Sequence, residues 1–118
     1  MDVWKVSARL AADVYRQLAD MRDYGFKDQI TRAALSIPSN IAEGMEKAST
    51  KEQMRFLEIA KGSAAEFATQ TWIGIEIDYI RKEVGKDWVQ KSQQILGMLT
   101  NLTKSIKHKN DKTDKNDP

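Results

Sequence analysis

The fold is decided by the stretch QITRAALSIPSNIAEGM, which occupies residues 29–45. Its apolar side chains, with one just before it, recur at three- and four-residue steps: Phe26, Ile30, Ala33, Ala34, Ile37, Ile41 and Met45. This spacing places them on one face of an α-helix. Pro38 lies inside the pattern, where its ring removes a backbone donor and clashes with the preceding turn. The helix could end near Ser36 and restart, but because the apolar period continues to Met45, we expect one helix with a kink at Pro38.

Three further amphipathic segments flank this stretch. Upstream, residues 3–22 predict a helix with Asp2 as its N-cap. Downstream, Ser49–Glu52 has the pattern of a capping box, and it should open a helix that runs without proline to about Lys82, which is long for a small domain. Beyond Gly85, apolar or small residues repeat at alternating four- and three-residue steps, as on one coiled-coil seam: Trp88, Ser92, Ile95, Leu99, Leu102 and Ile106.

Four such helices with short connections predict an all-α fold, an up-down-up-down antiparallel four-helix bundle with a kink at Pro38 and a long third helix. At 118 residues the chain fits one domain, which we assign to residues 1–107. Residues 108–118 contain no apolar side chain. A segment that buries nothing cannot offset its ordering entropy, so we expect a disordered polar tail there.

Composition argues against most catalytic chemistry. The chain has no cysteine and one histidine, His108, in the expected tail, so neither a Cys-His nor a Ser-His-Asp arrangement is credible. Carboxylates are present, but surface positions suit them better than metal ligation: Glu43, Glu46, Glu66, Glu76 and Asp78. No apolar run approaches the length of a membrane span. We therefore expect a soluble, cytoplasmic protein that is not an enzyme, with no metal, cofactor, small-molecule substrate or membrane partner.

Basic residues around the second and third helices are the candidates for contact with nucleic acid, because such clusters can bind phosphates: Arg32, Lys47, Lys51, Arg55 and Lys61. Lys51 and Arg55 are four residues apart and share one helix face. Glu46, Glu52 and Glu58 are interleaved with them. On the residues alone, an ordinary charged surface is the favoured interpretation.

The segment of residues 29–44 is distinctive, and it resembles the four-helix-bundle family of proteins encoded in intervening sequences of bacterial 23S rRNA genes. The resemblance continues through Asp2-Val3-Trp4-Lys5, Tyr15, Lys51-Glu52, Arg55-Phe56-Leu57, residues 59–66 and Thr69-Gln70. Its structural motif is Ile37, Pro38, Ser39, Asn40, Ile41, Ala42, Glu43 and Gly44. The family is related to the accessory variability protein of diversity-generating retroelements, which resembles a basic barrel that binds a reverse transcriptase and RNA.

The resemblance implies a homo-oligomer, a pentameric ring, with RNA or the ribosome as an expected associate. This sequence departs from the family at Glu46, where a more basic run is common, and this lowers the local positive potential. Within the motif, we expect Ser39 and Asn40 to bond backbone groups that Pro38 leaves unpaired. We also expect Glu43 and Glu66 to pair with Arg32 or Arg55.

Two functions follow as hypotheses. The first is a non-enzymatic oligomeric scaffold or adaptor that associates with RNA or a ribonucleoprotein. The alternative is a scaffold that binds only protein, through apolar surface.

Overall fold

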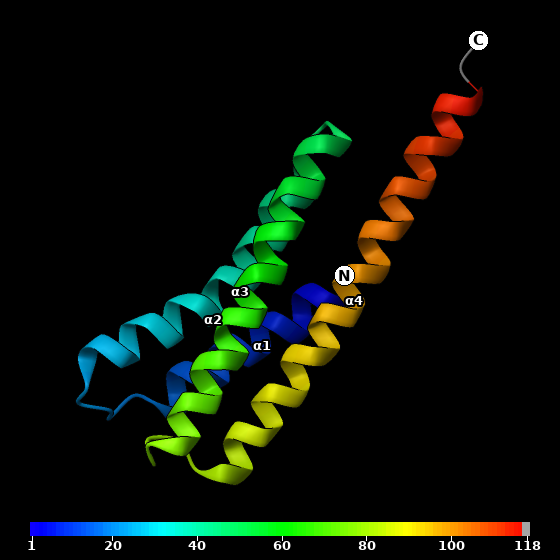
Figure 1. Ribbon diagram of the computed structural model, residues 1–118. Coiled ribbons are helices and arrows are strands. Elements are labelled where there is room, and N and C mark those ends of the chain that lie inside the picture. Colours follow the sequence, from blue (N-terminus) through cyan, green and yellow to red (C-terminus); the bar gives the residue numbers. More distant parts are fainter. Residues whose placement is uncertain (117–118) are drawn as a thin grey trace.

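The computed structural model describes the backbone of residues 1–116 and the side chains of residues 1–111. It contains four helices: α1 (Asp2–Gln17), α2 (Tyr24–Met45), α3 (Thr50–Glu76) and α4 (Lys82–Asn116). They form a slender antiparallel bundle, about 60 Å long and 20 Å across (Figure 1). No strand occurs in the described residues. The predicted all-α four-helix bundle is confirmed.

Helix contacts define four corners. α1 packs on α2 and α4, and α3 packs on α2 and α4. In the described part of the chain, the backbones of α1 and α3 do not approach each other closely, and neither do those of α2 and α4. The core between them is built by side chains from all four helices, and Trp88 and Phe67 are its largest fully buried members. Their rings are 5.9 Å apart. Burial of these apolar side chains is the main force that holds the helices together.

Both ends of α1 differ from the predicted helix of residues 3–22. Met1, without a side-chain bond, is the N-cap of α1, and Asp2 lies inside the helix. α1 ends at Gln17 rather than residue 22, because Asp23 caps α2 instead: its Oδ1 accepts from the Phe26 N–H at 3.1 Å. Leu18 still packs in the core, so the spacing of buried apolar residues continues past the end of the helix.

Asp23 also joins two turns that are far apart in the sequence. Its second carboxylate oxygen accepts a hydrogen bond from the Tyr79 hydroxyl at 2.8 Å, and the Tyr79 ring meets Phe26 edge-on. The backbone bond from Phe26, and then the bond from Tyr79, lower the pKa of Asp23, whereas the carboxylate raises the pKa of Tyr79. At neutral pH the charged carboxylate therefore holds the α1–α2 turn against the α3–α4 turn.

α3 begins as predicted and ends early. The Ser49 hydroxyl accepts from the Glu52 N–H at 3.1 Å, which confirms Ser49 as the N-cap. The helix stops at Glu76, not near Lys82. The stop is a Schellman-type motif, with bonds from Tyr79 N to Gly74 O at 2.8 Å and from Asp78 N to Ile75 O at 3.1 Å. The longest helix is thus α4, with 35 residues, and not the third.

The turn after α3 depends on Asp78, whose φ of 62° lies in the left-handed region. This conformation costs about 1–2 kcal/mol for an ordinary L-residue, and aspartate tolerates it better than a β-branched side chain. We expect Asp78→Val to lower the free energy of unfolding by about 1–2 kcal/mol, and Asp78→Gly to leave it unchanged or higher. Urea denaturation of the three proteins measures this. Equal losses in both variants would show that the side chain, not the backbone, holds the turn.

α2 is continuous through Pro38, as the apolar period predicts; the kink stays a prediction. The Asn40 amide donates to the Ser36 carbonyl and hydroxyl, both at 2.8 Å. The carbonyl that loses its helical donor at Pro38 is that of Ala34, so these bonds are not the ones expected. The Ser36 hydroxyl in turn bonds that of Ser63 on α3 at 2.8 Å. Ser39, by contrast, is exposed. Ser36, held by Asn40 of the motif, therefore ties α2 to α3 beside the proline.

The buried face of the motif consists of Ile37, Pro38, Ile41 and Gly44. A Cβ at Gly44 would lie 3.1 Å from Phe56 Cβ and 3.3 Å from the Gln53 carbonyl oxygen. The last turn of α2 can therefore approach the backbone of α3 closely only because this residue has no side chain.

The backbone of residues 108–116 continues α4, where the sequence predicted a disordered tail. Extending a helix that is already formed adds one hydrogen bond per residue without a new nucleation cost. Asn110 also bonds to α3, through a 3.2 Å contact between its Oδ1 and Thr50 Oγ1. Residues 117–118 of the predicted tail lie outside the described part, and the division at residue 107 otherwise stays a prediction.

Candidate nucleic-acid interface

The structure brings three of the five predicted basic residues together. Lys47, Lys51 and Arg55 lie at the turn from α2 to α3. Arg32 is exposed but 13 residues before the end of α2, or roughly 20 Å away along the helix at 1.5 Å per residue. Arg32 is therefore not part of this cluster.

An aromatic ring organises the cluster. The Lys47 ammonium lies 5.1 Å and the Arg55 guanidinium 4.5 Å from the centre of the Phe56 ring. These are cation–π distances. A cation-flanked aromatic ring is a surface that single-stranded nucleic acids use for stacking and phosphate contact. Helical periodicity alone does not predict this arrangement.

Each of these two cations also has a carboxylate. Lys47 Nζ is 3.2 Å from Glu43 Oε1, and Arg55 Nε is 3.1 Å from Glu52 Oε2. Exposed Lys51 has no acidic side chain within salt-bridge distance among the residues whose side chains are described. The local positive potential is therefore weaker than the number of cations suggests.

The predicted pairing of Glu43 and Glu66 with Arg32 or Arg55 is wrong. Glu43 pairs instead with Lys47, which lies four residues later, just beyond the end of α2. Glu66 accepts instead from Gln70 Nε2 at 3.2 Å, one turn later on α3.

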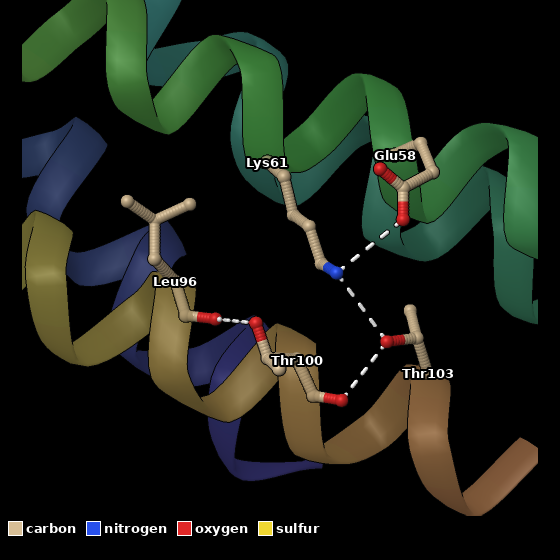
Figure 2. A network of polar contacts seen from close by, with 5 residues as sticks. All are labelled: Glu58, Lys61, Leu96, Thr100 and Thr103. Atoms are coloured by element: carbon tan, nitrogen blue, oxygen red, sulfur yellow. Dashed lines mark hydrogen bonds and ion pairs between the residues drawn. The ribbon is translucent and has the colours of Figure 1, made fainter.

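Lys61 points across the bundle rather than into solvent. Figure 2 shows its ammonium between Glu58 Oε1 on α3 and Thr103 Oγ1 on α4, each at 3.3 Å. Thr103 donates onward to the Thr100 carbonyl at 2.9 Å. With both contacts made and a side chain only 22% exposed, Lys61 joins two helices and is poorly placed to bind phosphate.

The helix that carries the excess positive charge, α4, contains none of the predicted basic residues. α4 contains eight lysines and four acidic residues, and none of the acidic residues lies between Asp87 and Asp111. Lys104, Lys107 and Lys109 are exposed in that interval. The contacts Thr50–Asn110 and Lys61–Thr103 place this half of α4 beside the first half of α3. A count of charges per helix would have found it.

Two apolar faces stand open on opposite sides of the bundle. On the α1–α2 side, Trp4, Tyr15 and Leu35 are each more than 40% exposed and line a shallow groove of about 630 Å³. On the α3–α4 side, Trp72 is 59% exposed and lines a groove of about 380 Å³. The four-corner arrangement puts these pairs of helices on opposite sides. Exposed apolar areas of this kind mark sites of association.

No group of three or more histidine or acidic residues that could hold a metal ion occurs among residues 1–111, where side chains are described. In the same part of the chain, no helix is both long and apolar enough to cross a membrane.

Comparison with known proteins identifies a matching family and a similar fold. Residues 1–101 match the family model of the 23S rRNA-intervening sequence protein. The fold is similar to a crystal structure from Bacteroides thetaiotaomicron, described as a protein with unknown function from the S23 ribosomal protein family, with a TM-score of 0.81 and 24% identity over 86% of this chain and 98% of that one. No curated protein matches. The resemblance seen in residues 29–44 is thus confirmed, and the chain belongs to the 23S rRNA-intervening sequence protein family.

Proposed function

We propose that this protein is a non-enzymatic, cytoplasmic scaffold that assembles into a ring of identical subunits and associates with RNA or a ribonucleoprotein. The scaffold role is supported by two different apolar faces on opposite sides of the bundle, one containing Leu35 and the other Trp72. Such a subunit can bind the next copy on each side.

Unlike faces favour a head-to-tail contact. When one face of a subunit binds a different face of the next, the assembly closes into a ring if the rotation permits and otherwise extends as a filament. The two faces here include exposed tryptophans, Trp4 and Trp72, which supply large contact areas. Five subunits is the number that the family resemblance implies.

Association with RNA is supported by the charge of α4 and by the family's link to 23S rRNA genes. A ring would repeat Lys51, Lys104 and Lys107 around its axis, so that a weak patch becomes a multivalent one. RNA binding of this kind acts through release of counterions, and it must weaken as salt increases.

Charge reversal tests the RNA proposal. We expect Lys107→Glu and Lys51→Glu each to weaken retention of a single-stranded oligoribonucleotide, and to reduce the slope of log affinity against log salt by about 0.7 for each lost phosphate contact. The matched control is Lys91→Glu, the same change on the same helix, at a lysine that pairs with Asp87. Filter binding between 50 and 200 mM salt measures the slope.

The second candidate function is a scaffold that binds only protein. Neutralisation of Lys47, Arg55 and Lys61 by Glu43, Glu52 and Glu58 favours it. If the purified oligomer retains no RNA at low salt, RNA association is excluded and this candidate stands. Equal weakening of retention by all three charge reversals would show that Lys51 and Lys107 are not specific RNA contacts.

A further inference from the structure

The Arg55 guanidinium is held in one orientation by two neighbours on α3. Its Nε donates to Glu52 Oε2 at 3.1 Å, and its central carbon lies 4.5 Å from the centre of the Phe56 ring. A guanidinium is planar and donates hydrogen bonds only at its edge, so the bond to Glu52 covers neither face of the plane. Phe56 covers one face. Because the Arg55 side chain is 58% exposed, the other face is open to solvent.

The Phe56 ring behind Arg55 is fixed by the packing of α2 on α3. Phe56 is partly buried, and the last turn of α2 comes so close that a Cβ at Gly44 would lie 3.1 Å from the Phe56 Cβ. The Lys47 ammonium also lies 5.1 Å from the centre of the ring. The guanidinium therefore has a support that is already ordered before a ligand arrives, and such preorganisation reduces the entropic cost of binding.

Two lysines lie at the same level of the bundle as Arg55. Lys51 is one turn before Arg55 on the same face of α3. Lys107 is one turn after Thr103 and one turn before Asn110, and both of these residues bond to α3 (Figure 2 shows the first contact). Lys107 is therefore on the side of α4 that faces the first half of α3. Among the residues whose side chains are described, neither lysine has a carboxylate within salt-bridge distance.

The carboxylates near this turn do not cancel the charge of these two lysines. Between residues 43 and 58, three of the acidic residues already pair with a cation: Glu43, Glu52 and Glu58. The remaining one, Glu46, follows Ala42 by four residues. Because Ala42 lines the groove between α1 and α2, Glu46 is on that side of α2 and not beside Arg55. A ligand on the open face of Arg55 therefore meets net positive charge.

We propose that an unpaired base of single-stranded RNA stacks on the open face of Arg55, with Lys51 and Lys107 as contacts for the adjoining phosphates. Unpaired bases stack on arginine planes as they do on aromatic rings. An aromatic side chain of a partner protein could use the plane, but it carries no anion for the two lysines, whereas a nucleotide supplies both. A duplex keeps its bases inside the helix, so Arg55 would favour single strands. The proposal rests on the RNA association proposed above, and it names the form of RNA and the residue that recognises it.

Arg55→Lys tests the proposal, because it keeps the charge and removes the plane. Phe56→Leu, the second variant, keeps an apolar side chain and removes the ring behind the plane. Both full-length variants and the wild type are titrated with a short single-stranded oligoribonucleotide and with inorganic polyphosphate, which has the charge but no base. We expect both variants to bind the oligoribonucleotide about tenfold more weakly, within the range for one stacked base, and to bind polyphosphate as the wild type does. The matched control is Arg32→Lys, the same change at an exposed arginine outside the cluster, which should alter neither.

Three outcomes would overturn the stacking proposal while RNA association stands. Equal weakening of RNA and polyphosphate binding in Arg55→Lys would show that Arg55 contacts phosphate. Unchanged RNA binding in Arg55→Lys would show that no base rests on this plane. The same loss in Arg32→Lys would show that the effect is not specific to the site. If the wild type binds no RNA at low salt, the proposed RNA association fails, and the stacking proposal fails with it. Because Arg55 is exposed, its substitution leaves the core intact, so a folding defect in Phe56→Leu alone does not affect the result.

Discussion

Replacing Trp88 with alanine should lower the free energy of unfolding by about 3–5 kcal/mol, the usual cost of a fully buried tryptophan or phenylalanine. Trp88 is 0% exposed, packs against Phe67, and donates its indole N–H to Asp13 Oδ2 at 2.8 Å. The substitution would therefore open a cavity between α3 and α4 and also break the polar link from α4 to α1. Small domains have only about 5–15 kcal/mol of stability, so the loss would be severe.

Two milder variants separate these contributions. Trp88→Phe keeps most of the volume but loses the N–H donor, and Asp13→Ala removes only the acceptor. Each should cost about 1.5–3 kcal/mol, the range for a hydrogen bond to a charged group. Denaturant unfolding followed by circular dichroism measures all three. A loss below about 1 kcal/mol for Trp88→Ala would mean that this side chain does not pack in the core as described.

Gly85→Ala and Gly97→Ala should change stability in opposite directions, although both glycines lie in α4. A Cβ at Gly85 would come within 2.5 Å of Ile75 Cγ1, and the β-branched Ile75 can move only by changing a stiff χ1 angle. Overpacking of this kind costs about 1–3 kcal/mol. Gly85 is buried where α4 first meets the end of α3, so a shift there would separate the two helices.

Gly97 is the matched control, because a Cβ there would meet nothing within 4 Å. In an open helix interior, alanine is favoured over glycine by about 1 kcal/mol. We therefore expect Gly97→Ala to raise the midpoint of thermal unfolding, and Gly85→Ala to lower it. Stabilisation by both variants would show that Ile75 does not press on Gly85.

The sequence predicts the fold well where periodicity and capping chemistry agree. The α4 seam through Leu99 is buried as predicted, and Ser49 caps α3. Helix ends were missed because apolar residues beyond them still pack: Leu18 and Ile80 are both buried outside any helix. A pattern of buried residues cannot tell a helical turn from a cap that folds the chain back on the core.

The candidate site was less predictable, because it depends on which way long side chains point. Lys61 and Arg55 share a helix, yet one reaches α4 and the other lies over Phe56. In both cases the carboxylate partner lies three residues earlier. The sequence contains this spacing, but it also contains other possible partners and does not show which one each cation contacts. The partial burial of Leu102 and Ile106 depends on the level at which α1 starts beside α4, which only the packed structure shows.

Native mass spectrometry of Leu35→Glu mixed with Trp72→Glu in equal amounts tests the proposed ring, whose subunits are joined by two unlike faces. Each variant loses a different face, so each alone should be monomeric. In the mixture the intact α3–α4 face of Leu35→Glu should bind the intact α1–α2 face of Trp72→Glu, which yields a 1:1 heterodimer and nothing larger. Absence of that heterodimer, or persistence of the wild-type assembly in either variant alone, would contradict a ring joined through these two faces.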